Sequence, residues 1–200
     1  MNMSKNKRIA KVSRKTKETD ITIELNLDGT GKADISTGVG FLDHMLDSFA
    51  RHGLFDLKVK AEGDLHVDSH HLIEDTGIVL GEAIKEAVGD KKGINRYGFF
   101  TLPMDEALVL SAVDLSGRPY LVFDVEFKTP AMGDYDTQMV REFFYAVSYS
   151  AGMNLHLKQF SGENDHHVCE ACYKAFAKAM MGAVAVNERI EDVLSTKGKI

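Results

Sequence analysis

Residues 68–77 read DSHHLIEDTG, and residues 164–173 read NDHHVCEACY. Each stretch places two adjacent histidines three and four residues ahead of a glutamate, at the start of an apolar run that predicts a helix. The two copies lie 96 residues apart in a chain of 200. A motif that recurs after about half the chain predicts a fold built by internal duplication.

The elements around the first copy follow a simple order. Apolar and polar residues alternate over 20–37 about the sequence Asp-Gly-Thr-Gly at 28–31, which predicts a hairpin. A helix is then expected over 41–53, a strand over 56–62 and the motif helix over 70–88.

The second half repeats this order. We expect a hairpin over 107–127, a helix over 137–152, a strand over 155–159 and the motif helix over 166–184. The segments 8–16 and 96–104 are each expected to add one strand. The prediction is an α+β protein, an internal duplication of a sheet-plus-two-helices unit with the helices packed between the two sheets.

The net charge excludes one broad class of partner. It is −6, from 24 basic and 30 acidic side chains, so the chain carries no general attraction for nucleic acid or an anionic membrane. The hydrophobic content of 44% and charged content of 27% are ordinary for a soluble globular protein.

The N-terminal 17 residues contain seven Lys or Arg and no acid. They lack the apolar segment of a secretory signal, and no run of eighteen apolar residues occurs in the chain. A transit peptide is one alternative, and an edge strand after a basic terminus is the preferred interpretation. We expect a cytoplasmic location. Cys169 and Cys172 are interpreted as buried helix residues of a reducing compartment.

The histidine motifs have the spacing of metal ligands. On a helix His70 and Glu74 share one face, whereas His71 points about 100° away, and the same holds for the second copy. If the halves are related by an approximate two-fold axis, the pair from one copy can meet a single histidine from the other. Two equivalent sites would result, and the ligand types favour manganese or iron over structural zinc.

Each site needs further ligands, and the preceding helices are their natural source. His44 lies 26 residues before His70, and Glu142 lies 24 residues before His166. Both are candidate ligands. Three other histidines are weaker candidates for a role in ligand or substrate orientation: His52, His66 and His156.

Several motifs together resemble one enzyme family. They are DGTGKADISTGVGFLDHMLDSFARHG at 28–53, HHLIED at 70–75, DTQMVREFF at 136–144, DHHVCEACYKAFAKA at 165–179 and STKG at 195–198. From about Arg8 to Lys197 the chain resembles the imidazoleglycerol-phosphate dehydratases of histidine biosynthesis. The halves 1–92 and 93–200 are expected to form one compact catalytic domain.

The resemblance implies two divalent metal ions, Mn²⁺, in each active site and a 24-subunit homo-oligomer whose active sites lie where subunits meet. Carried over by motif, the expected metal ligands are His44, His70, His71, Glu74, Glu142, His166, His167 and Glu170. Many family members have histidine where this chain has Glu142. The two metal sites are therefore expected to be chemically unequal.

The implied reaction removes water from imidazoleglycerol phosphate and gives imidazoleacetol phosphate. The carbon-bound proton that leaves is not next to a carbonyl, so the imidazole ring must hold the charge. Two cations on its nitrogens would favour a metal-bound imidazolate and then a diazafulvene-like intermediate. Glu18 matches the family's general acid and base, and His71 and His167 are expected to be catalytic with it. Asp105 and Glu106 occupy the corresponding place in the second half.

The substrate's phosphate needs cationic and hydroxyl donors, and the arginine fork matches it well. The residues expected to bind substrate or its phosphate are Glu18, His52, Arg96, Arg118, Lys174, Ser195, Thr196 and Lys197. The short C-terminal tail is expected to become ordered when substrate arrives.

Two other functions use the same side chains. A dinuclear metallohydrolase would release phosphate without dehydration, through a bridging hydroxide. A metal-storage or metal-sensing protein would bind no phosphorylated imidazole and would exchange its metal rapidly.

Overall fold

The computed structural model describes residues 8–200, and the basic terminus expected at 1–7 lies outside them. The first half contains β1 (Ile9–Lys15), β2 (Thr19–Asn26), β3 (Ala33–Ser36), α1 (Gly40–Gly53), β4 (Asp56–Gly63) and α2 (His70–Val88). The second half contains β5 (Tyr97–Met104), β6 (Ala107–Asp114), β7 (Tyr120–Asp124), β8 (Ala131–Met132), β9 (Tyr135–Asp136), α3 (Gln138–Ala151), β10 (Asn154–Ser161) and α4 (Asp165–Val184). The four expected helices are confirmed.

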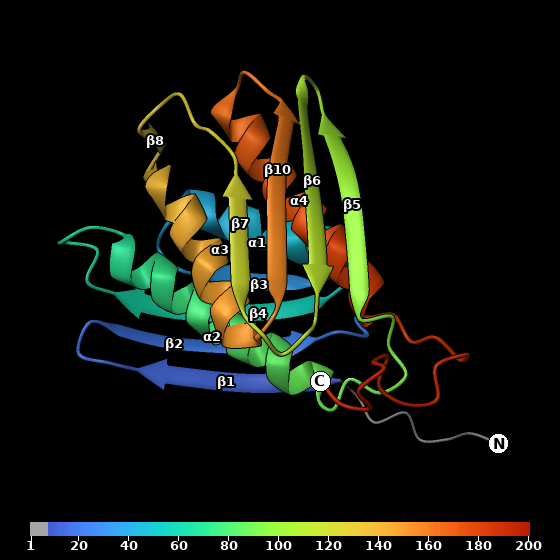
Figure 1. Ribbon diagram of the computed structural model, residues 1–200. Coiled ribbons are helices and arrows are strands. Elements are labelled where there is room, and N and C mark those ends of the chain that lie inside the picture. The colour runs from blue at the N-terminus through green and yellow to red at the C-terminus, as the bar shows by residue number, and fades with distance from the viewer. Residues whose placement is uncertain (1–7) are drawn as a thin grey trace.

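The two four-stranded sheets have the same strand order (Figure 1). The first sheet is ordered β1-β2-β4-β3 and the second β5-β6-β10-β7. In each sheet the strand that comes last in sequence, β4 or β10, lies between the two strands before it in that sheet. The extra strands expected over 8–16 and 96–104 are β1 and β5, and each forms a hairpin with the next strand. The predicted α+β class with a duplicated unit is confirmed.

Both hairpins predicted from the sequence, over 20–37 and 107–127, are wrong. β2 pairs antiparallel with β4, and β3 pairs with the other side of β4 in parallel. β6 and β7 flank β10 in the same way. Parallel neighbours need a crossover, and α1 and α3 are the helices that provide it.

In each half a polar side chain at the start of β4 or β10 bonds the turn that was predicted to close a hairpin. Asp56 Oδ1 accepts hydrogen bonds from the backbone N–H groups of Thr30, at 2.8 Å, and Lys32, at 3.1 Å. At the equivalent position Asn154 donates to the carbonyl oxygen of Arg118, at 2.6 Å. These long-range bonds direct the chain past β4 or β10 instead of back along the preceding strand.

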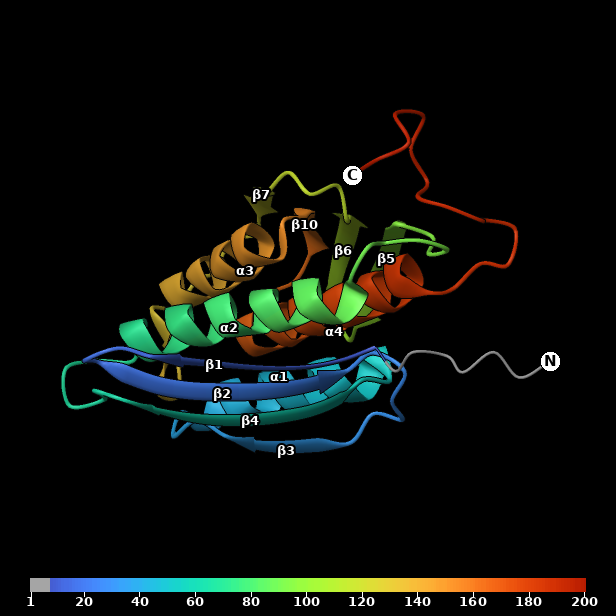
Figure 2. The same cartoon turned by 90° about the horizontal axis from the view of Figure 1, so that it is seen from below.

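The helices form a double layer between the two sheets (Figure 2). α2 packs on β1 and β2, and α4 packs on β5 and β6. Across the layer α2 contacts α3, and α1 contacts α4, so each helix pair combines the two halves. The expected burial of the helices between the sheets is confirmed.

The two helix pairs pack differently. α2 meets α3 through glycines: a Cβ on Gly77 would lie 2.8 Å from the carbonyl oxygen of Phe143, and one on Gly81 would lie 2.6 Å from that of Val147. α1 meets α4 through aromatic rings, because Phe49 stacks on Phe176 at a centroid distance of 5.4 Å. Both arrangements bring the start of a motif helix beside the start of a helix from the other half.

Within residues 8–200, none of the helices combines the length and apolar character needed to cross a membrane. Cys169 and Cys172 are free thiols buried in α4, as expected.

Candidate metal centre and active site

Three side chains from both halves meet at the start of α4. His44 lies on α1, and His166 and Glu170 lie one turn apart on α4. Glu170 Oε2 lies 3.4 Å from His44 Nε2 and 3.2 Å from His166 Nε2. One ligand atom from each of the three residues lies within 4.8 Å of the others. We call this group the α1–α4 cluster, and its imidazole and carboxylate donors fit a first-row divalent metal ion.

The carboxylate of this cluster is held in place by burial and by a lysine. The Glu170 side chain is 8% exposed, and its Oε1 lies 2.5 Å from Lys174 Nζ. Burial raises the pKa of Glu170, but Lys174 and His44 together bring that pKa below its ordinary value. Glu170 is therefore ionised, with Lys174 on one oxygen and the two histidines near the other.

The equivalent group at the start of α2 is more open. His70 Nε2 lies 3.5 Å from Glu74 Oε2, and with Glu142 of α3 His70 lines a cavity of about 340 Å³. We call His70, Glu74 and Glu142 the α2–α3 cluster. The Glu142 carboxylate accepts a hydrogen bond from Arg141, at 2.9 Å. Among residues 8–200, the α1–α4 cluster alone brings three donor residues within 4.8 Å of one another.

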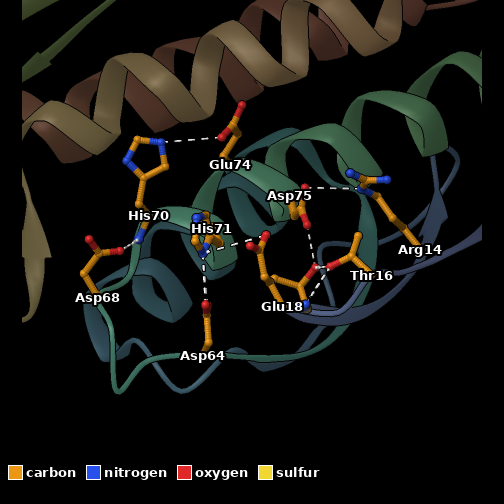
Figure 3. Close-up of polar contacts among 10 residues, drawn as sticks. Arg14, Thr16, Glu18, Asp64, Asp68, His70, His71, Glu74 and Asp75 are labelled. Carbon is orange, nitrogen blue, oxygen red and sulfur yellow. Dashed lines mark hydrogen bonds and ion pairs between the residues drawn. The ribbon is translucent and has the colours of Figure 1, made fainter.

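The second histidine of each motif is bonded to a carboxylate instead of joining these clusters. His71 Nδ1 lies 3.0 Å from Asp64 Oδ2 (Figure 3), and His167 Nδ1 lies 2.8 Å from Glu106 Oε2. Asp64 raises the pKa of His71, and Glu106 raises that of His167. A bond to Nδ1 leaves Nε2 as the free coordinating atom.

Asp64 is a site residue that the sequence reasoning missed. It follows β4 directly and lies seven residues before His71. The available signal was an acid at the end of the strand that precedes the motif helix, where a turn returns the chain to the helix start. Spacing on the helix alone gave no reason to look there.

Glu18 lies beside the same histidine. Its Oε2 is 3.9 Å from His71 Nδ1, and its side chain is 56% exposed (Figure 3). Glu18 also lines a groove of about 330 Å³ with Asp64 and His66. In the second half Asp105 Oδ2 lies 3.7 Å from His167 Nε2.

A cavity of about 980 Å³ opens beside the α1–α4 cluster. Its walls include His44, His166, His167 and the loop 129–134. This segment contains β8 and the turn that leads into β9, and its Asp134 accepts a hydrogen bond from the first backbone N–H of α1, at 3.0 Å. The sequence analysis did not anticipate this wall.

Five of the candidate phosphate-binding residues line one cavity of about 480 Å³. They are Arg96, Arg118, Ser195, Thr196 and Lys197. The Arg96 guanidinium bonds the Asp114 carboxylate at 2.7 Å and donates to the carbonyl oxygen of Leu194 at 2.8 Å. Arg96 thus ties the C-terminal segment to the start of the second sheet. We call this the basic cavity.

Within the chain the basic cavity and the α1–α4 cluster lie at opposite ends of β10. Arg118 is bonded to Asn154, the first residue of β10, whereas the second motif follows Ser161, the last. An eight-residue strand spans roughly 25 Å. The structure therefore does not bring the two predicted groups together in one chain.

The remaining candidates are scattered. Lys174 lies beside Glu170, away from the basic cavity. Burial, with Lys174 and Lys178 nearby, lowers the pKa of His52. His156 lies on β10, exposed, paired with Ala112 and Val122.

The fold and the site define a duplicated α+β protein in which each of two histidine–glutamate clusters combines both halves. A family model described as imidazoleglycerol-phosphate dehydratase matches residues 37–180. Relatives with that name are 65% identical over 193 residues in Lachnoclostridium phytofermentans, covering 96% of this chain and 98% of the relative, and 61% identical over 189 residues in Acetivibrio thermocellus, covering 94% and 97%.

Two solved structures agree with these relatives. The Staphylococcus aureus imidazoleglycerol-phosphate dehydratase is 40% identical with a TM-score of 0.81, covering 90% of this chain and 99% of that one. The Pyrococcus furiosus enzyme, in complex with (S)-C348, is 40% identical with a TM-score of 0.82, covering 94% and 100%. The chain belongs to the imidazoleglycerol-phosphate dehydratase family. It is a hydro-lyase, with imidazoleglycerol-phosphate dehydratase activity in histidine biosynthesis.

Proposed function

We propose that this chain dehydrates D-erythro-imidazoleglycerol phosphate with two divalent metal ions, Mn²⁺, one at the α1–α4 cluster and one at the α2–α3 cluster. The observation that carries the proposal is the approach of His44, His166 and Glu170 within 4.8 Å of one another. A buried, ionised carboxylate between two imidazoles is better explained by cation binding than by packing in the hydrophobic core. Two histidines and one carboxylate leave open positions that manganese, with its preference for six ligands, can fill with substrate.

When bound, the metal ions would act as Lewis acids that favour loss of the proton from the substrate's imidazole ring. The protein's own residues provide the rest of the chemistry. Glu18 is the proposed proton carrier, because its carboxylate is exposed beside His71 and makes no close bond to it. The diazafulvene-like route expected from the sequence is the pathway these roles support.

We further propose that the active site is completed by a second copy of this chain. His71 and His167 join neither cluster of their own chain, and their hydrogen bonds to carboxylates are made through Nδ1. A neighbouring subunit is therefore the natural place for Nε2 to coordinate. The basic cavity is roughly a strand's length from the α1–α4 cluster and equally needs a neighbour. Both features favour the homo-oligomer of 24 subunits implied by the resemblance.

The phosphate would be held in the basic cavity. Arg96 is already oriented by Asp114, so its guanidinium needs little ordering before it binds an anion. Hydroxyl donors would come from Ser195 and Thr196, and Lys197 would add charge. A cytoplasmic location is part of the proposal, and two buried free thiols are compatible with a reducing compartment.

The proposal is tested by removing metal with a chelator, adding Mn²⁺ back and following imidazoleacetol phosphate. We expect no product without metal and full recovery with Mn²⁺, and full activity without metal would contradict the proposal. Phosphate release without dehydration would support the hydrolase. Rapid metal exchange without binding of a phosphorylated imidazole would support the storage protein.

Alanine variants in the same assay distinguish the proposed metal-binding histidines from a histidine outside both clusters. His71→Ala and His167→Ala should each abolish turnover and disturb assembly. His156→Ala is the matched control, because this exposed histidine on β10 belongs to neither cluster. Full activity in either of the first two variants would remove that histidine from the proposed site.

A further inference from the structure

The two halves place a glutamate at the same point of the duplicated unit. β2 and β6 each span eight residues and pair antiparallel with β4 and β10, in matching register except for a bulge in β10 between Gln159 and Ser161. The residue before β2 is Glu18, and the residue before β6 is Glu106. Both lie beside the second histidine of a motif, His71 in the first half and His167 in the second. Glu18 and Glu106 are therefore equivalent residues.

Their bonding is different. Glu106 Oε2 lies 2.8 Å from His167 Nδ1, and Oε1 accepts from the backbone N–H groups of residues 163–164 at 3.1 and 2.8 Å. Both oxygens of Glu106 are occupied. Glu18 Oε2 lies 3.9 Å from His71 Nδ1, which is too long for a hydrogen bond. The carboxylate of Glu18 is free of the bond that fixes its counterpart.

Asp64 accounts for this difference. It follows β4, and its carboxylate occupies His71 Nδ1 at 3.0 Å, the place that Glu106 takes on His167. Counted across the bulge in β10, Gly162 matches Gly63, and the residue equivalent to Asp64 is Glu163. Glu163 bonds Glu106 through its backbone N–H, and the His167 Nδ1 position is taken by Glu106 instead. Because Asp64 already holds His71, Glu18 is not needed to bond it.

The Glu18 side chain does not hold the turn before β2 in place. Other residues of the first half hold this turn instead. The hydroxyl of Thr16 accepts hydrogen bonds from the backbone N–H groups of Glu18, at 3.0 Å, and Thr19, at 2.9 Å. The buried hydroxyl of Thr19 donates to Asp75 at 2.5 Å, and Arg14 bonds the other Asp75 oxygen at 3.2 Å. Figure 3 shows Asp75 between Arg14 and the turn that carries Glu18.

The second half lacks this anchor. The residues equivalent to Thr19 and Asp75 are Ala107, the first residue of β6, and Ala171, the residue after the motif glutamate. Both members of the polar pair are thus alanine where the turn is held by the side chain of Glu106. The pair and the bonded glutamate are alternative ways to fix one turn.

We propose that Asp64 and Asp75 are positioning residues that keep the Glu18 carboxylate unbonded and in place for proton transfer. Asp64 does so by satisfying His71, and Asp75 by anchoring Thr19. The inference rests on the proposed function, in which Glu18 carries the proton. It assigns to two acids outside the metal clusters a role that their counterparts in the second half do not have.

The test is a double-mutant cycle on the Mn²⁺-loaded enzyme. Asp64→Gly removes the carboxylate that holds His71 and lets Glu18 bond this histidine, so kcat should fall about 10- to 100-fold while KM changes less than about threefold. Asp64→Asn retains an acceptor and should recover most of kcat. In the Glu18→Gln background, itself slower by about 100-fold or more, Asp64→Gly should cause no further loss. Bound Mn²⁺ per subunit should equal that of the parent.

The Thr19→Ala/Asp75→Ala double variant copies the second half and gives an independent arm. It should lower kcat more than it changes KM, and again only when Glu18 is present. Asp34→Asn, at an exposed acid on β3, is the control and should leave both constants unchanged.

The results distinguish a failure of the roles proposed for Asp64 and Asp75 from a failure of the role proposed for Glu18. An undiminished loss from Asp64→Gly in the Glu18→Gln background, or a loss that follows lost Mn²⁺, would overturn the inference alone. Full activity of Glu18→Gln would remove Glu18 from the mechanism and the inference with it. Should Asp64→Gly fail to fold, the Thr19/Asp75 arm decides.

Discussion

The start of α2 and the start of α4 carry the same motif in two different settings. At α4 the motif glutamate Glu170 is buried, bonded to Lys174 and close to His44 and His166. The second motif histidine, His167, is bonded to Glu106. At α2 the Glu74 side chain is 42% exposed, and Glu18 stays 3.9 Å from the second histidine. Duplication copied the motif, but the neighbouring residues decide which copy is fixed and which is open.

This difference indicates that the two motif copies are suited to different roles. The α4 end is suited to hold a metal ion in a preformed geometry, because its carboxylate is already ionised and directed at two imidazoles. The α2 end is suited to move a proton, because its nearby glutamate is unbonded. Substitutions at the fixed end and at the open end should therefore have different effects.

The largest expected effect compares the two motif glutamates. Glu170→Gln should lower Mn²⁺ affinity and turnover by more than about 100-fold, because it also leaves Lys174 without its carboxylate. Glu74→Gln should lower Mn²⁺ affinity less, since its site is open and solvated. Metal titration and steady-state kinetics check both. Equal losses, or a larger loss from Glu74→Gln, would break the comparison.

A smaller effect is expected at the helix contact beneath the open end. Gly81→Ala would place a Cβ 2.6 Å from the Val147 carbonyl oxygen, so α2 and α3 must separate. We expect a loss of about 1–3 kcal/mol in the free energy of unfolding, measured with urea. Metal binding at the α2–α3 cluster should weaken more than binding at the α1–α4 cluster.

Gly182→Ala on α4 is the matched control for that substitution. A Cβ at Gly182 would lie 3.7 Å from its nearest neighbour, so it meets no obstacle. Helix propensity then predicts a gain of up to about 1 kcal/mol. Equal destabilisation by both alanines would show that the close approach of α2 and α3 is not what Gly81 serves.

The smallest effect concerns pH in the metal-free protein. The bond between Glu106 and His167 lowers the pKa of Glu106 to about 2 and raises that of His167. The histidine's contribution to stability is complete below its unfolded pKa, about 6.5, and is lost as pH rises through the raised folded value. The glutamate's contribution is complete above its unfolded pKa, about 4.3, and is lost as pH falls through about 2.

Both contributions are therefore complete between about pH 4.3 and 6.5. Glu106→Gln should lower Tm more near about pH 5.5 than near about pH 8.5. Glu18→Gln, at the open end, should change Tm little at either pH. A Tm loss from Glu106→Gln that is the same at both pH values would contradict the assignment of that bond.

The sequence predicted what depends on local spacing. Helical periodicity located α1 to α4, and the i, i+4 relation placed His166 and Glu170 on one face. His44 was expected as a further ligand from the helix before the first motif, but the sequence did not say which motif it would meet. Residues 20–37 were misread because alternation identifies a strand but not its partner, and the bonds from Asp56 that redirect this turn come from 24 and 26 residues away in sequence.

Contacts between distant residues were the part that the sequence could not give. Asp64 and Asp75 act through His71 and Thr19, and neither acid has a spacing that marks it as functional. The basic cavity gathers Arg96 and Arg118 with the C-terminal segment, and phosphate binding by these residues stays a prediction. Lys174 lies with Glu170 because it is one turn further along α4.

The most direct test of the account is anomalous diffraction at the manganese edge from crystals of the Mn²⁺-loaded protein. The account predicts two peaks per subunit, one coordinated by His44, His166 and Glu170 and the other by His70, Glu74 and Glu142. A neighbouring copy's second motif histidine should complete each site. A strong peak elsewhere, with both clusters empty, would contradict the claim that the duplicated motif builds a pair of metal sites from both halves.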